Sequence, residues 1–265
     1  MAAVLLLAGC GGDRSAASSD APTGASAGTS GSGSGAGEVV VYLVRHGETV
    51  FNQLGEMQGW SDSPLTPAGE ELADQAGAAL ADHDFVAAYA SDLGRTRATA
   101  EHILAGQGGS APELVTMPEL REWYFGGFEG NPNDDAWGTV LSEHGYDWTQ
   151  VQQDFAGFAD EIGGQSAMAT MVAESDPLGL AEDADQITTR LVEGFDTLVG
   201  EVAEQGGGEV LVVSHGLAIG SLLEALDPQH EATAFHNLAL TTITVRDGVA
   251  TIGTVNDTDY LLAAS

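Results

Sequence analysis

The chain has 265 residues, with 40 acidic residues against 7 basic ones and a formal net charge of −33. Such a charge makes nucleic acid and an anionic membrane surface unfavourable partners, and it is typical of salt-tolerant or of acidic secreted proteins. An anionic substrate would need a local cluster of cations, and every basic residue is an arginine: Arg14, Arg45, Arg95, Arg97, Arg121, Arg190 and Arg246.

The chain opens on the apolar run "AAVLLLAGC", which ends at the single cysteine, Cys10. One cysteine excludes an internal disulfide framework and a thiolate metal cluster. "LAGC" resembles the lipobox of bacterial lipoproteins, which implies that Cys10 is lipidated and becomes the mature N-terminus of a protein anchored to the cell membrane outside the cytoplasm. Residues 1–9 lack the positive charge that opens most secretion signals, and a start placed downstream of the true one would explain this departure. The alternative is a chance apolar N-terminus with a buried cysteine; the run is too short for a transmembrane helix.

Residues 11–37 are almost entirely Gly, Ser, Ala and Thr. This composition cannot bury a core, and it predicts a disordered, flexible tether. The remaining residues, 38–265, have the length of one domain.

Within this domain, predicted strands alternate with predicted helices. Apolar, β-branched runs predict strands at 38–44, 85–91, 113–117 and 208–216, helical patterns predict helices at 63–82, 94–106 and 217–226, and the end of the chain predicts a hairpin that turns at Asp247-Gly248. In the first helix, Thr66 is the expected N-cap and Pro67 the first helical residue. The alternation predicts an α/β three-layer sandwich, in which a mainly parallel sheet has helices on both faces.

The span 131–182 departs from this pattern, because it is rich in Asp, Gly and Trp and has weak helical periodicity. We expect a mobile helical insertion that overhangs the site, with a passive surface excursion as the alternative. Aromatic residues in and before this span could line an apolar pocket for a leaving group or could only pack the insertion onto the core. They are Trp60, Trp123, Tyr124, Trp137, Tyr146 and Trp148.

Three predicted strands end in residues that suit a phosphoryl group. "LVRHG" supplies Arg45 and His46, "SDLGRTR" supplies Arg95 at the start of a helix, and "VVSHG" supplies His215. Ligands of such sheets bind beyond the carboxyl ends of the strands, so these four side chains are expected to meet. Arginine matches the oxygens of a phosphate, and a histidine can attack phosphorus to form a phosphohistidine.

The departing alkoxide needs an acid, and "LREWYFGGFEG" (120–130) offers Glu122, with Glu119 and Glu129 as alternatives. A partly buried carboxyl there should have a raised pKa. A metal site built from His46, His215 and Glu122 is disfavoured, because the paired arginines would repel a cation.

These motifs together resemble the histidine phosphatase superfamily, in its phosphoglycerate-mutase-like branch. The resemblance covers 39–130 and 185–255, and "RHGETVFNQLGEMQGWSDSPLTPAG", "SDLGRTRATA", "LREWYFGGFEG" and "VSHG" occur in the family's order. It implies His46 as nucleophile, Glu122 as proton donor, and a phosphate site without metal or cofactor. The phosphate ligands that it implies are Arg45, Asn52, Arg95, His215 and Gly216.

Several nearby residues have competing interpretations. Asn52 could instead cap a turn, and Asn237 could support the site or only form a turn. Arg97 is expected in solvent, and a surface role is favoured for Arg121 over contact with substrate. His83, His102, His144 and His230 occupy ordinary helix or loop positions.

Three functions fit this pattern. The first is a phosphomonoester hydrolase acting on a small molecule, and the second is a mutase, which would need a basic pocket for a second anionic group. The third is a tethered lipoprotein that binds a phosphorylated ligand without turnover. The absence of lysine and the predicted export signal favour the hydrolase, whereas the substrate and the oligomeric state are not indicated.

Overall fold

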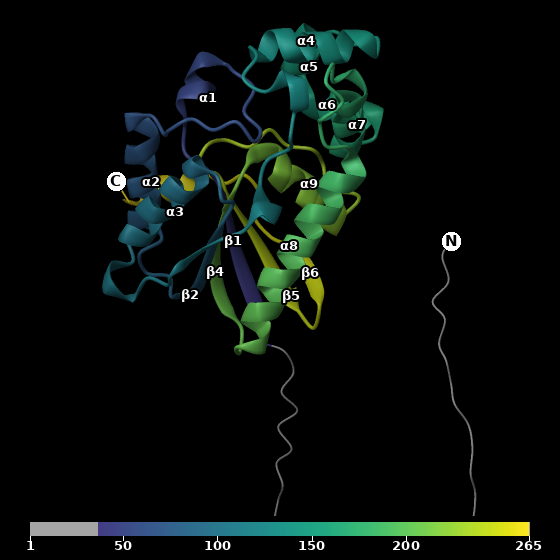
Figure 1. Ribbon diagram of the computed structural model, residues 1–265. Coiled ribbons are helices and arrows are strands. Elements are labelled where there is room, and N and C mark those ends of the chain that lie inside the picture. The colour runs from purple at the N-terminus through teal and green to yellow at the C-terminus, as the bar shows by residue number, and fades with distance from the viewer. Residues whose placement is uncertain (1–36, 265) are drawn as a thin grey trace, which may run out of the picture. The chain divides into compact units, whose positions relative to one another are not determined.

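The structure is a computed structural model that describes residues 37–264 (Figure 1). The predicted signal segment, Cys10 and residues 11–36 of the predicted tether lie outside the described residues. Among residues 37–264, none of the helices has both the length and the hydropathy that crossing a bilayer requires.

A six-stranded mixed sheet forms the centre of the domain, in the order β3-β2-β4-β1-β5-β6. The first four strands are parallel to one another, β5 is antiparallel to β1, and β6 is antiparallel to β5. The strands are β1 (Val39–Arg45), β2 (Phe85–Ala90), β3 (Leu114–Thr116), β4 (Gly208–Ser214), β5 (Leu240–Arg246) and β6 (Val249–Ile252). The expected α/β sandwich with a mainly parallel sheet is confirmed, and the last two strands pair as the predicted hairpin about Asp247-Gly248, where both residues have positive φ.

The strands alternate their apolar residues between the two faces of the sheet, as a period of two requires. In β1, Val39, Val41 and Leu43 pack on one face with α8 (Ala184–Glu204) and α9 (Gly216–Leu226). Val44 packs on the other face with α2 (Pro67–Ala79) and α3 (Gly94–Ala105). Figure 1 shows these helix pairs on opposite sides of the sheet.

The first long helix begins as the sequence predicts. Thr66 is the N-cap of α2, its hydroxyl accepts from Gly69 N at 3.0 Å, and Pro67 is the first helical residue. Residues 63–65 of the predicted segment lie before the helix, and Leu65 pairs with Thr49 in an isolated bridge. A short helix, α1 (Val50–Leu54), was not predicted, and its Thr49–Asn52 capping box supports only five residues.

Helix α8 was also not predicted, although a helical signal is present. Ile187, Leu191, Leu198 and Val202 repeat at helical spacing and are all buried. Glycines and β-branched residues weaken the propensity of this segment, but packing against the sheet outweighs propensity in long helices.

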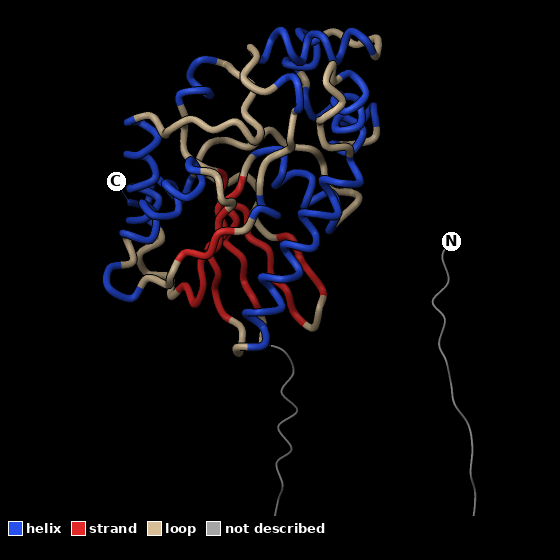
Figure 2. The backbone as a smooth tube through the Cα atoms, in the orientation of Figure 1, coloured by secondary structure: helices blue, strands red, loops and turns tan. Residues whose placement is uncertain are grey.

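Residues 131–182 form four short helices: α4 (Asn133–Glu143), α5 (Trp148–Gln153), α6 (Phe155–Ile162) and α7 (Gln165–Ser175). Their residues Trp137, Val140, Phe158 and Met168 pack in one core with residues outside the insertion, such as Trp123 and Leu191. In Figures 1 and 2 they gather beyond the carboxyl ends of the parallel strands, so the helical insertion lies over the end of the sheet where the site was expected.

Candidate active site

His46 follows the last residue of β1 and is only 3% exposed. Its Nδ1 lies 2.8 Å from the carbonyl oxygen of Gly47. A carbonyl only accepts, so Nδ1 carries the proton and Nε2 has the free lone pair. Burial lowers the pKa of His46 well below 6.5, and the charges of Arg95 and Arg45 lower it further. The imidazole is therefore neutral near pH 7, which is the nucleophilic form.

Arg45 precedes His46 in the chain and lines the same cavity. One terminal nitrogen of its guanidinium donates to the carbonyl of Phe235, whereas Nε is buried and has no hydrogen-bond partner among residues 37–264. Gly216 packs against the guanidinium, since a Cβ at that position would lie 3.5 Å from Nε. Arg45 and Gly216 both line the cavity, so their donors can converge on one anion.

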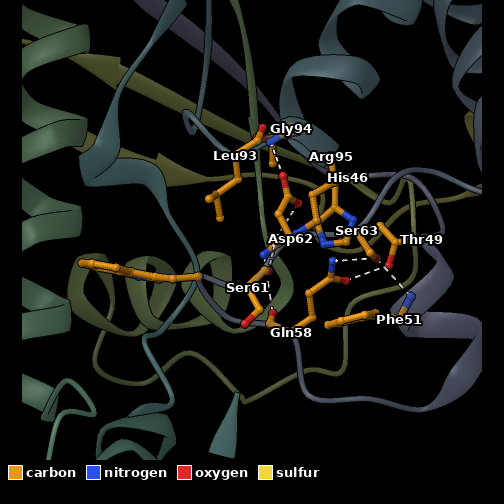
Figure 3. A network of polar contacts seen from close by, with 12 residues as sticks. His46, Thr49, Phe51, Gln58, Ser61, Asp62, Ser63, Leu93, Gly94 and Arg95 are labelled. Atoms are coloured by element: carbon orange, nitrogen blue, oxygen red, sulfur yellow. Dashed lines mark hydrogen bonds and ion pairs between the residues drawn. The ribbon is translucent and has the colours of Figure 1, made fainter. Parts of the chain in front are cut away.

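Arg95 and His215 form a second layer behind His46. Arg95 is 1% exposed, and its Nε donates to Nδ1 of His215 at 3.1 Å. Its other four N–H groups bind Asp62 and three carbonyls of the loop before α2, as Figure 3 shows in part. A direct phosphate contact by Arg95 would therefore require one of these bonds to be exchanged, while its charge already acts on the site.

His215 is completely buried, and its ring lies 5.2 Å from that of His46. Because Nδ1 accepts from Arg95, Nε2 carries the proton and donates to the hydroxyl of Ser91 at 2.8 Å. Both ring nitrogens are thus engaged by protein atoms. Contact between His215 and a phosphate stays a prediction, as it does for Arg95.

Glu122 also lines the cavity, and its carboxyl group sits at the N-terminus of α9. Oε1 accepts from the N–H groups of Trp123 and Ala218, and Oε2 accepts from that of Leu217 at 3.1 Å. Burial raises the pKa of Glu122, and these hydrogen bonds only partly oppose the rise. Oε2 accepts one hydrogen bond and Oε1 accepts two, so Oε2 is the oxygen better able to carry a proton.

The alternative acid Glu129 has a different position. Its two oxygens accept from four backbone N–H groups, those of Gly59, Trp60, Ser61 and Phe125. These bonds shape the loop whose carbonyls hold Arg95. Glu119 is half-buried and does not line the cavity. Of the three carboxyl groups, only that of Glu122 reaches the expected phosphate site.

Asn52 caps a turn, and its contact with phosphate stays a prediction. Its Oδ1 accepts from Thr49 N at 3.2 Å and so caps α1, while the residue lines the cavity. Asn237 Nδ2 donates to the carbonyl of His46 and to Asn52 Oδ1, which favours its interpretation as a support of the site. Among the described residues, Asn52 Nδ2 donates no hydrogen bond and is available to a ligand.

Sequence analysis missed the groups that hold the acid segment. Arg190 donates to the carbonyls of Glu119, Arg121 and Glu122 and pairs with Glu182. Trp60 Nε1 also donates to the carbonyl of Glu122, at 2.9 Å. An isolated arginine among helical residues offered no local signal for this role, because its acceptors are backbone atoms far away in the chain.

The remaining arginines with predicted roles lie away from the cavity. Arg97 is exposed, as expected. Arg121 makes two hydrogen bonds to Asp92, and its guanidinium lies 4.6 Å from the ring centre of Trp60. The surface role favoured for Arg121 therefore agrees with its contacts.

The cavity has a volume of about 240 Å³ and extends from Arg45 and His46 to the helices of the insertion. Trp137 and Trp148 line it, as two of the six aromatic residues named from the sequence. The insertion adds Phe155 and Met168. Within residues 37–264, no three histidine, cysteine or acidic side chains are placed to hold a metal ion.

Comparison with known proteins identifies the family. A family model for the histidine phosphatase superfamily (branch 1) matches residues 41–161 and 143–258, most of the described domain. The chain belongs to the histidine phosphatase superfamily. His46, His215 and Glu122 of this superfamily member all fall inside the matched span.

Relatives of known name within the superfamily include probable phosphoglycerate mutases. A probable phosphoglycerate mutase GpmB of Erwinia tasmaniensis is 33% identical over 186 residues, which are 70% of this chain and 74% of the relative. The corresponding protein of Yersinia enterocolitica is also 33% identical, over the same shares of the two chains.

Solved structures agree on the fold. The crystal structure of a phosphoglycerate mutase from Bacillus anthracis has a TM-score of 0.80 and 34% identity, covering 87% of this chain and 98% of that one. A phosphoserine phosphatase from Entamoeba histolytica, at 22% identity and a TM-score of 0.58, covers 84% of this chain and 99% of that one, and it shares the fold.

Proposed function

We propose that the protein is a phosphomonoester hydrolase that works through a phosphohistidine on His46, with Glu122 as its general acid and base. The observation that carries this proposal is the cavity itself. It brings a neutral histidine, a carboxyl group with a raised pKa and an arginine with an unpaired donor to one space.

In the first step, Nε2 of His46 attacks phosphorus while the bond from phosphorus to the ester oxygen breaks. The proton on Glu122 passes to that oxygen, so an alcohol leaves and the carboxylate remains. Arg45, Gly216 N–H and Asn52 Nδ2 surround the non-bridging oxygens and stabilise their charge. The positive charge of Arg95, directly behind His46, adds to this stabilisation.

In the second step, a water molecule attacks the phosphohistidine. Glu122 takes one proton from the water, the bond between phosphorus and nitrogen breaks, and phosphate leaves with His46 neutral again. Each turnover returns both side chains to their starting protonation states, so the cycle closes.

A mutase is the second candidate, because the relatives at 33–34% identity are named phosphoglycerate mutases. A mutase must hold a second anionic group while the first is transferred. Arg45 is the only lysine or arginine among the described residues that line the cavity, and Glu56 adds a negative charge there. A second phosphate or carboxylate would lie in a pocket without a second cation, which favours hydrolysis.

The test uses the purified protein and its His46→Ala variant with p-nitrophenyl phosphate. We expect turnover by the wild-type chain, a labelled phosphohistidine on His46 after an acid-free quench, and loss of both in the variant. Circular dichroism should be unchanged, because His46 lies at a strand end. Activity in the variant near the wild-type level would refute the mechanism, and efficient interconversion of phosphoglycerates primed by a bisphosphate would establish the mutase.

A further inference from the structure

Aromatic and thioether side chains form part of the cavity lining, the aromatic wall. Trp137, Trp148 and Phe155 come from three successive helices of the insertion, and Met57 and Met168 line the same cavity. Trp137 and Trp148 stack, with ring centres 6.0 Å apart and an interplanar angle of 21°. A substrate whose phosphate contacts Arg45 would therefore place its alcohol among aromatic and thioether side chains.

One carboxylate in the cavity lining and an exposed one bonded to Trp148 add negative charge near these rings. Glu56 lines the cavity, is half-buried, and among residues 37–264 has no hydrogen-bond or ion-pair partner for its carboxylate. Asp134, at the start of α4, accepts the indole N–H of Trp148 at 2.8 Å. This bond orients the indole and makes its ring face more negative.

Resting on the proposed function, we infer that the leaving alcohol of the preferred substrate carries an ammonium group, so that the substrate class is the phosphomonoesters of amino alcohols. An ammonium is attracted by the faces of aromatic rings, and quaternary ammonium groups are commonly bound by aromatic cages. Glu56 would supply the counter-ion that a half-buried cation requires. The same arrangement disfavours sugar acids and bisphosphates, because their second anionic group would face Glu56 and the rings.

The net charge of the whole chain also favours a substrate that carries an ammonium group. The insertion 131–182 contains no lysine or arginine, and the protein carries a net charge of −33. A field of this sign repels a substrate with two negative charges, and it repels a zwitterionic phosphoester less. A neutral apolar alcohol would pack against the aromatic wall equally well, but it would leave the Glu56 carboxylate in the cavity without a partner.

The test compares phosphocholine with 3,3-dimethylbutyl phosphate, which has the same shape without the positive charge. We expect kcat/KM of the full chain to be about tenfold or more higher for phosphocholine. Glu56→Gln and Trp148→Leu should each lower this ratio severalfold. Glu143→Gln, which removes an exposed charge from α4, is the matched control and should leave the ratio unchanged.

A ratio near one in the wild-type chain, or a ratio that neither Glu56→Gln nor Trp148→Leu lowers, would overturn the inference. Hydrolysis of p-nitrophenyl phosphate separates this failure from failure of the proposed function. If the aryl phosphate is hydrolysed and the charged ester has no advantage, only the substrate class is wrong. If none of the three esters is hydrolysed, the hydrolase proposal itself fails.

Discussion

Glu129 gives the most direct test of how the phosphate site is built, because its carboxylate binds four backbone N–H groups. Oε2 accepts from Gly59 at 3.2 Å and Ser61 at 2.9 Å, and Oε1 accepts from Trp60 at 2.8 Å and Phe125 at 3.1 Å. In Glu129→Gln, one of these oxygens becomes an NH₂ group. Two backbone donors then face another donor.

The magnitude follows from the number of bonds lost. Hydrogen bonds to charged groups contribute about 1.5–3 kcal/mol each, and the half-buried position of Glu129 lets water replace part of the loss. We therefore expect the free energy of unfolding to fall by about 3 kcal/mol. For a domain of this size, that corresponds to a decrease in Tm of roughly 6–12 °C.

A loss of activity should accompany the loss of stability. The carbonyls of Gln58, Gly59 and Ser61 accept from Arg95, so disorder in this loop displaces the guanidinium behind His46 (Figure 3). The loop is tightly packed at Gly59, because a Cβ at this position would lie 2.2 Å from the carbonyl oxygen of Trp123. We expect kcat to fall about tenfold or more at a temperature where the variant is folded.

The assay is urea denaturation of the wild-type chain, Glu129→Gln and Glu101→Gln, followed by kinetics at 20 °C or below. Glu101 is exposed on α3 and is the control for removing one negative charge. A decrease in stability below about 0.5 kcal/mol, the size of an ordinary surface substitution, would refute the assigned role of Glu129. An unchanged kcat together with the expected decrease of about 3 kcal/mol would also refute it.

Three further predictions concern the acid, the pH dependence of activity and the anchor. Glu122→Gln should slow hydrolysis of an alkyl phosphate about 10²–10⁴-fold and slow that of p-nitrophenyl phosphate much less, since only a poor leaving group needs the proton. Equal losses on both substrates would mean that Glu122 has another role. Activity of the wild-type chain should fall as the pH drops through the lowered pKa of His46, because protonation removes the lone pair of the imidazole. It should also fall as the pH rises through the raised pKa of Glu122, because the acid is then ionised. Glu122→Gln should flatten the alkaline limb and keep the acidic one, and a pH–rate profile between about pH 4 and 9 checks this. Cys10→Ser should move the protein from the membrane fraction to the medium or to an unprocessed precursor, and an unchanged membrane fraction in immunoblots would contradict lipidation.

The sequence by itself determined the fold class and the residues that meet at the end of the sheet. The runs that became β1, β2 and β4 are apolar because both faces of a parallel sheet are buried, and each is followed by residues of the site. Once a parallel sheet is inferred, its topology requires that the carboxyl ends of these strands lie together. His46, Arg95 and His215 could therefore be grouped without coordinates.

Only the tertiary structure decided which of the three carboxyl groups lines the cavity and which side chains form its aromatic wall. Glu119, Glu122 and Glu129 lie within eleven residues of one another and have the same chemistry. Glu122 accepts from Ala218 N at the start of α9, Glu129 accepts from Ser61 N in the loop before α2, and Glu119 does not line the cavity. The second layer formed by Arg95 and His215 depends on the loop before α2 in the same way. The aromatic wall with Glu56 arises because the insertion folds back over the site. Sequence spacing cannot show such contacts, because they join segments of the chain whose separation in space is set by packing and by hydrogen bonds to the backbone.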